Sequence, residues 1–165
     1  MLRCSMSCAI LCPAGSQKFK ILSILHKDER GKEIDPHYNL LDMIFKGQII
    51  RKADFEEFEQ ERLEEHQQVV GPDGYSCLQR AMLEHNILML SKIYLNISLE
   101  SMGEFLNIEA DKAEQIIGDM IFENRIRAKL DQRASTVYFD VEFGGKGIEV
   151  AGASQQQQDS AAVDQ

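Results

Sequence analysis

The sequence lacks the short motifs that usually reveal an enzyme. It contains no Gly-rich phosphate loop, no dinucleotide-binding fingerprint and no His-Glu-x-x-His zinc motif. A Gly-x-Ser-x-Gly nucleophile elbow and the protein-kinase signatures are absent as well. Tryptophan is missing, and the few aromatic residues fall within apolar stripes rather than among basic residues. These absences argue against an autonomous enzyme, and we expect no cofactor.

Positive charge is also scarce. Lys and Arg number 18 against 27 Asp and Glu, so the formal net charge is −9. Nucleic acids and anionic membranes attract clustered cations, so we expect neither as the main partner. No apolar stretch approaches the length of a membrane span. The first apolar run is short and broken by Ser5 and Ser7, which argues against a secretory signal. We therefore expect a protein of the cytoplasm and nucleus.

The four cysteines form no familiar metal or disulfide pattern. Cys4, Cys8 and Cys12 repeat every four residues, which places them on one face of a helix, and Cys77 is remote in sequence. Their spacing fits neither a Cys-x-x-Cys zinc pair nor a disulfide scaffold. We expect structural thiols in a reducing compartment and no metal site.

Before residue 73 the pattern predicts a helical bundle. A first helix breaks at residues 13–15, and Ser16 caps the next one. Asp35 followed by Pro36 starts a third helix. A glutamate-rich surface helix follows between residues 53 and 68. The expected apolar faces of the second, third and fourth helices contain Phe19, Ile21, Leu22 and Leu25, then Leu40, Leu41, Ile44 and Phe45, then Phe55 and Phe58.

The helix expected between residues 75 and 94 is apolar on two faces. One stripe contains Leu78, Ala81, Met82, His85, Met89 and Ile93, and the other contains Leu83, Ile87, Leu90 and Tyr94. Such a helix must be covered on both sides, so we expect it to join the upstream bundle and the downstream segment into one rigid unit. We expect His85 to be a hydrogen-bonded core residue rather than a metal ligand.

Residues 97–141 read as helix, turn, helix and two strands, which is the order of a winged helix. Ser98 is expected to cap the first helix, and Asn124 to end the second in a left-handed cap. The apolar faces of these two helices contain Leu99, Met102 and Leu106, then Ala113, Ile116, Ile117, Met120 and Ile121. Beyond them the period changes to two. Ile126, Ala128 and Leu130 alternate with Arg127 and Lys129, and Val137, Phe139 and Val141 repeat the alternation.

The second helix of this unit is net negative, which is unsuited to binding DNA. Between residues 109 and 125 the sequence has five acidic residues and only two basic ones. The acidic residues are Glu109, Asp111, Glu114, Asp119 and Glu123, and the basic ones are Lys112 and Arg125. Phosphate contacts require clustered Lys or Arg, so this helix would be repelled from a groove. Winged helices also dock proteins, and we favour docking over nucleic-acid binding, which stays an alternative.

A helical bundle that runs through a shared helix into an acidic winged helix resembles the PCI domain, a scaffold module. Several strings narrow the resemblance to the family of fourth subunits of the COP-nine signalosome. They are Lys27-Asp28-Glu29-Arg30, Asp73-Gly74 with Leu78, Arg80 and Ala81, Glu84-His85-Asn86, Ser91-Lys92-Ile93-Tyr94, Lys112-Ala113-Glu114, Met120-Ile121, Asp131-Gln132 and Tyr138-Phe139. Together they cover roughly residues 8–141, and their common order makes them specific.

The resemblance implies a mostly α fold. A right-handed helical-repeat or bundle segment would span residues 1–72, a shared helix 73–96, and a winged helix with a small antiparallel sheet 97–143. It also implies a non-catalytic scaffold, bound to other PCI subunits in a hetero-oligomer that removes a ubiquitin-like modifier from cullins (deneddylation). The catalytic subunit of that complex carries a His-x-His motif, which this sequence lacks. PCI subunits of the proteasome lid or of translation initiation factor three are alternatives.

In PCI complexes the winged helices pack side by side and their sheets form an arc. This implies that the strands near residues 125–130 and 137–141 offer unpaired edges to a neighbour. The residues expected at that interface are Arg125, Arg127, Lys129, Val137, Phe139 and Val141. Residues 144–165 have few large apolar side chains and are predicted to be disordered. Family members carry helical repeats before this segment and a helix after it, so we expect a fragment or a short form.

Overall fold

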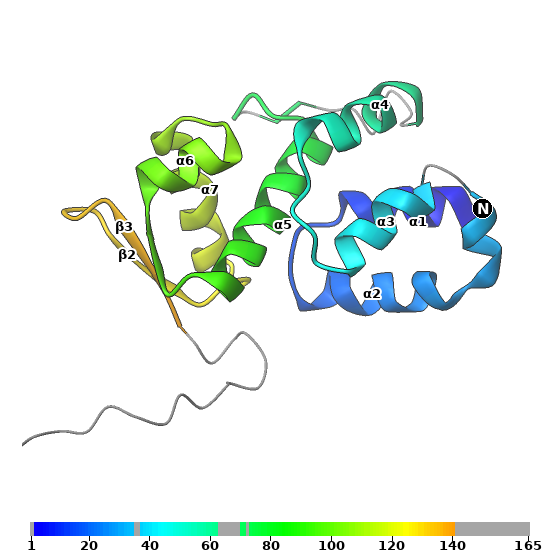
Figure 1. The fold of residues 1–165 in the computed structure, drawn as a ribbon, viewed down its shortest axis with the longest axis horizontal. Coiled ribbons are helices and arrows are strands. Elements are labelled where there is room, and N and C mark those ends of the chain that lie inside the picture. The colour runs from blue at the N-terminus through cyan, green and yellow to red at the C-terminus, as the bar shows by residue number, and fades with distance from the viewer. Residues whose placement is uncertain (1, 35–36, 63–69, 72, 141–165) are drawn as a thin grey trace, which may run out of the picture.

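The computed structural model describes residues 2–34, 37–62, 70–71 and 73–140. The first half is helical and contains α1 (Leu2–Leu11), α2 (Ser16–Lys27), the 3₁₀ helix η1 (Glu29–Glu33), α3 (His37–Phe45) and α4 (Lys52–Arg62). The second half contains β1 (Asn96–Ser98), α6 (Leu99–Leu106), α7 (Ala110–Phe122), β2 (Ala128–Asp131) and β3 (Thr136–Phe139). Between them runs the long helix α5 (Cys77–Ile93) (Figure 1). The predicted mostly α fold with a winged helix is confirmed.

The core of the helical half is built from α1, α2, α3, α4 and the first part of α5. Its fully buried side chains include Met6, Ile10, Leu22, Leu41, Ile44 and Leu78. Phe55 and Phe58 of α4 are buried in the same cluster, as the thin apolar line of that helix predicts. The predicted start of the third helix at Asp35 and Pro36, and the predicted disorder of residues 144–165, lie outside the described residues.

Helix α2 differs from its prediction in two respects. Gly15 occupies the cap position and Ser16 is the first helical residue, with no side-chain capping bond. Ile21, expected in the core, has 41% of its surface exposed, whereas Lys18 is only 2% exposed. The Nζ atom of Lys18 donates a hydrogen bond of 2.8 Å to the carbonyl oxygen of Ile10. A residue that periodicity does not place on the apolar face is therefore buried, with its ammonium group hydrogen-bonded.

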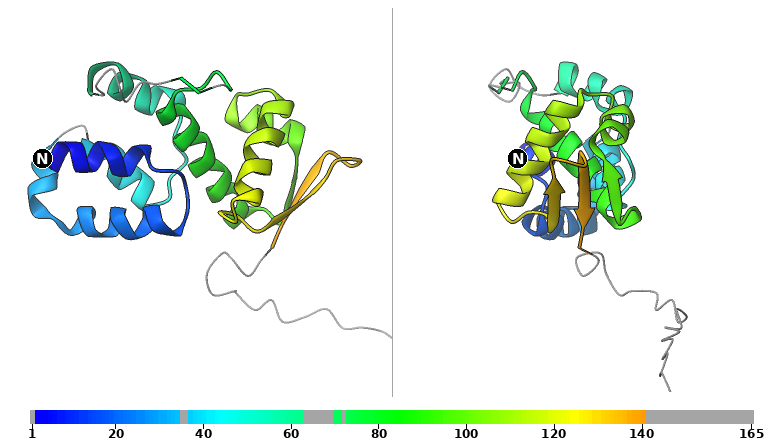
Figure 2. Two further views of the ribbon diagram at one scale, coloured as in Figure 1. Left: turned by 180° about the vertical axis from the view of Figure 1, so that it is seen from behind. Right: turned by 90° about the vertical axis from the view of Figure 1, so that its left-hand side faces the viewer.

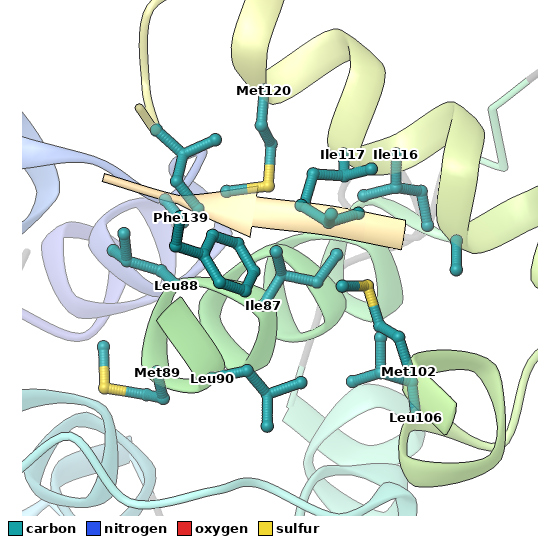
Figure 3. Packing of buried hydrophobic residues seen from close by; sticks show 14 of the residues in the cluster. Ile87, Leu88, Met89, Leu90, Met102, Leu106, Ile116, Ile117, Met120 and Phe139 are labelled. Carbon is teal, nitrogen blue, oxygen red and sulfur yellow. The ribbon is translucent and has the colours of Figure 1, made fainter. Parts of the chain in front are cut away.

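Helix α5 contributes to two separate cores along its length. A capping box between Ser76 and Gln79 starts it. Its first turns place Leu78, Ala81 and Met82 in the helical half. Its later turns place Ile87, Leu88, Met89 and Leu90 against α6, α7 and β3, as Figure 3 shows with Met102, Leu106, Ile116, Ile117, Met120 and Phe139. The predicted coverage on two sides is confirmed, so the helix links both halves.

The last turn of α5 does not follow the predicted stripes. Ile93 and Tyr94 were expected on the two covered faces, yet 68% and 44% of their surfaces are exposed. The chain leaves the helix here and turns into β1, because Tyr94 is the C-terminal cap and has an extended backbone. Helical periodicity therefore no longer predicts the direction of the Tyr94 side chain, and Ile93, the last helical residue, lies beyond Leu90, where the buried residues of α5 end.

The winged helix forms as its sequence pattern predicts. The Ser98 side chain caps α6 by accepting the backbone N–H of Ser101, and Asn124 has the left-handed backbone expected of it, with φ of 54°. The stripes of α6 and α7 are buried, apart from half-buried Ile121. The sheet has three strands in the order β1-β3-β2, all antiparallel. The sequence pattern missed β1, because three residues are too short to show a period of two.

Candidate docking surface

The β2–β3 hairpin lies at the end of the molecule farthest from α1 and α2 (Figure 2). Its inner face covers α5 and α7 with Val137 and Phe139, which are 0% and 6% exposed. Its outer face carries a row across the sheet, in which Asn96 of β1, Tyr138 of β3 and Lys129 of β2 are register partners. All three side chains are exposed, so the outer face is polar and accessible.

Strand β3 is not an edge, which corrects one sequence prediction. It pairs with β1 on one side and with β2 on the other. Val137 and Phe139 therefore cannot present a free backbone edge, and their side chains belong to the core. β1 supplies the extra neighbour that the sequence did not reveal. Val141, the third member of the predicted set on this strand, lies outside the described residues.

Strand β2 does have an outer edge. The N–H of Asp140 donates to the carbonyl of Arg127, so alternate residues from Arg127 onward pair with β3. By the same alternation, Ala128 and Leu130 direct their backbone groups away from β3. Among the described residues no strand lies beside that side of β2. The edge prediction therefore holds for β2, where Arg127 and Lys129 are exposed.

Arg125 is not part of this surface, which corrects a second prediction. It lies in the turn after α7, and its side chain is only 15% exposed. Its guanidinium makes a two-pronged ion pair with Glu84 of α5: Nη2 lies 3.0 Å from Oε1, and Nη1 contacts Oε2. Nη1 also donates to the carbonyl of Ala14, in the turn between α1 and α2. Arg125 therefore joins the winged helix to the helical half.

Glu84 is the centre of a larger charged cluster. Its side chain is 3% exposed, and Oε2 accepts the backbone N–H of Ala14 at 3.1 Å. Arg80, one turn earlier on α5, contacts Glu84 and also pairs with Asp73 and with Asp119 of α7, both at 2.7 Å. Burial opposes the charge of Arg80, but hydrogen bonds to Asp119, Asp73 and Glu84 outweigh it and raise the pKa of Arg80. We name Asp73, Arg80, Glu84, Asp119 and Arg125 the interdomain ion cluster.

The interdomain ion cluster changes the interpretation of the acidic helix α7. Asp119 pairs with Arg80, and Glu123 accepts a hydrogen bond of 2.6 Å from Nε of Arg125. Two of the five acids that argued against nucleic acid therefore have a structural role. Glu109 and Asp111 remain exposed at the start of the helix. The sequence signal for this role was the Arg80–Glu84 spacing of four residues on one helix, which alone does not indicate a long-range partner.

Three observations on the described residues concern metal binding, the environment of His85 and membrane insertion. They contain no group of three or more His, Cys, Asp or Glu side chains placed to hold a metal ion. His85 is 1% exposed, and its Nε2 lies 2.9 Å from the carbonyl of Gln48, so it is the satisfied core residue that the sequence predicted. None of the described helices has both the length and the apolar character that crossing a membrane requires.

Comparison with known proteins gives one family and a consistent set of relatives. Residues 43–141 match the family model of the PCI domain. The chain is 40% identical over 139 residues to COP9 signalosome complex subunit 4 of Drosophila melanogaster and 37% identical over 139 residues to that of Arabidopsis thaliana. Each alignment covers 84% of this chain and 34% of the relative. Neurospora crassa subunit 4 is 34% identical over 92% of this chain. The chain spans about a third of the length of these curated relatives.

Proposed function

The chain belongs to the PCI-domain family, and from that premise we propose that it is a non-catalytic scaffold segment of the COP9 signalosome that docks sideways onto other PCI subunits. The observation that carries the proposal is the outer edge of β2, where Ala128 and Leu130 direct their backbone groups away from the sheet. Similarity to signalosome fourth subunits from an animal, a plant and a fungus favours this complex over the proteasome lid or initiation factor three.

Strand addition supplies the physical mechanism. A partner strand laid along β2 would extend the three-stranded sheet, with backbone hydrogen bonds to Ala128 and Leu130. Lys129 is exposed between those positions, so a strand with acidic side chains on the outer face would pair best. Docking at the β2–β3 hairpin would also orient the helical half, because Glu84 and Arg125 of the interdomain ion cluster both bond the backbone of Ala14 between α1 and α2.

Substituting Ala128 by Pro tests the edge directly. Proline removes the N–H that faces the free edge and leaves the hydrogen bonds of Arg127 and Lys129 with β3 intact. Tagged wild-type and variant chains are purified from cells, and co-purifying proteins are quantified by mass spectrometry. We expect signalosome PCI subunits with the wild type and about tenfold less with the variant.

Arg133→Ala, an exposed substitution at the hairpin turn, is the matched control and should leave recovery unchanged. Equal recovery with Ala128→Pro would exclude docking through β2. Recovery of proteasome-lid or initiation-factor subunits instead would assign the chain to another PCI complex. A mobility shift of nucleic acid that weakens steeply with salt would support the alternative of nucleic-acid binding.

We also propose a location in the cytoplasm and nucleus, which imaging of the tagged chain checks.

A further inference from the structure

A groove of about 840 Å³ lies between the two halves of the molecule. One wall is the connection between α3 and α4, and the other is the end of α6, with α5 between them (Figure 1). The apolar lining includes Ile49, Phe55, Met82, Leu83, Phe105 and Ile108. Its volume is within the range of about 300–1,000 Å³ that is typical of ligand pockets. None of its described lining residues belongs to β2, so it is a surface separate from the β2 edge.

Both walls of the groove are held in place. The Asn86 side chain bonds both backbone groups of Ile50, receiving its N–H at 2.9 Å and donating to its carbonyl at 2.7 Å. On the other wall Asn107 adopts the left-handed conformation, and the N–H of Ile108 donates to the carbonyl of Gly103 at 2.9 Å. A preformed groove binds a partner without first having to order its own walls.

One end of the groove carries a charge opposite to the net charge of the molecule. Arg51 and Lys52 line this end, and none of the described lining residues is Asp or Glu, although the chain has a net charge of −9. Lys52 also begins α4, whose N-terminus adds positive potential that the Asp54 carboxylate in the first turn partly offsets. The Asp54 carboxylate accepts the backbone N–H of Arg51 at 2.7 Å, and Arg51 itself is exposed. At the opposite end lies Tyr75, whose pKa is raised by burial and by Glu109 and Asp73.

The aromatic ring of Phe105 gives the groove an apolar anchor. Half of its surface is exposed, although its neighbour Leu106 is buried in the winged-helix core. An exposed aromatic beside a preformed apolar groove is typical of residues that dominate binding energy. We propose that this groove is a second docking site and that it receives a short apolar segment of a partner protein, with acidic residues at the end that meets Arg51 and Lys52.

The test is selection from a random-peptide phage library on the full chain, followed by fluorescence anisotropy with the selected peptides. We expect peptides in which apolar residues adjoin Asp or Glu. Phe105→Asp should weaken their binding by about tenfold or more, because it replaces the anchor with a charge that repels them. Arg51→Glu combined with Lys52→Glu should weaken it similarly, and added salt should reduce wild-type binding.

Phe122→Asp is the matched control, because Phe122 is 87% exposed at the end of α7 and does not line the groove. It should leave peptide binding unchanged, and circular dichroism should show that every variant is folded. Ala128→Pro should also leave it unchanged, so failure of the sheet-edge proposal and failure of this one are distinguishable. Selection of basic peptides, of none, or of peptides that bind Phe105→Asp equally would overturn the proposal. It would also be overturned if peptides bound only after removal of residues 144–165, because the chain's own tail would then be the occupant.

Discussion

At the scale of single residues, the buried Glu84 carboxylate requires partners for its oxygens. A buried carboxylate is tolerated only when its oxygens are paired, and Arg125, Arg80 and the backbone N–H of Ala14 meet that need. These partners come from the α1–α2 turn, from α5 and from the turn after α7. One acidic side chain therefore connects three segments that are distant in sequence.

Substituting Arg125 tests how much these contacts contribute to the free energy of unfolding. Arg125→Leu leaves the buried Glu84 carboxylate with only the 3.3 Å contact to Arg80 and the N–H of Ala14, so we expect the free energy of unfolding to fall by about 3 kcal/mol. Urea unfolding followed by circular dichroism measures it. Replacing both partners, with Glu84→Leu and Arg125→Leu together, should recover part of the loss, because no buried charge is then unpaired. A double variant less stable than the sum of the two single losses would contradict this account.

His85 makes stability depend on pH. Burial lowers the pKa of His85 to about 4, although its hydrogen bond to the Gln48 carbonyl acts in the opposite direction. In the unfolded chain its pKa returns to about 6.5. Between these values the unfolded chain binds a proton that the folded chain does not, so stability is lost as the pH falls from about 6.5 towards 4.

The expected loss between pH 7 and pH 4.5 is about 2–3 kcal/mol. Urea unfolding of the wild type and of His85→Gln, measured at both pH values, isolates this contribution, because carboxylates titrate equally in both proteins. Gln can donate the same hydrogen bond and does not titrate. We expect the variant to be less sensitive to acid by that amount. Parallel pH profiles would show that His85 is protonated in the folded state.

At the scale of elements, the two faces of β3 lie in different environments. Phe139 faces the core and Tyr138, its neighbour, has 45% of its surface exposed on the outer face of the sheet. Phe139→Asp should therefore cost at least about 4 kcal/mol and prevent stable folding. Tyr138→Asp should change stability by about 1 kcal/mol or less. Thermal unfolding compares the two, and a similar loss for both would refute the assigned faces of β3.

At the scale of the whole molecule, α5 makes the two halves depend on each other. Its first turns fill one core and its later turns fill the other, and the interdomain ion cluster links both. We therefore expect the described residues to unfold in one cooperative transition.

Leu90→Ala tests this cooperativity, because Leu90 is fully buried in the winged-helix core. We expect a loss of about 2–5 kcal/mol. Native-state hydrogen exchange should show the same loss for the most protected amides of α3 and of α7. Ile24→Ala, at a position 71% exposed on α2, is the control and should change neither. A loss confined to α7 would mean that the halves unfold separately.

Local features of the fold could be predicted from the amino-acid sequence. Capping at Ser98, the left-handed turn at Asn124 and the buried stripes of α6 and α7 depend on neighbours within one helical turn, so local pattern predicts them. The two-faced character of α5 was visible for the same reason. The order of elements of a winged helix was visible in the same way, and family resemblance added the expectation that a sheet edge is an interface.

Tertiary structure alone decided which edge is available and which charges are internal. β1 is only three residues long, yet its pairing makes β3 a central strand and buries the predicted interface residues Val137 and Phe139. Arg125 read as a surface cation because Glu84, its partner, is 41 residues away. The groove between the halves likewise exists only once α6 and the α3–α4 connection lie beside α5. These contacts join segments that are far apart in the sequence, and no periodic pattern of residues marks them. Only the folded structure therefore reveals them.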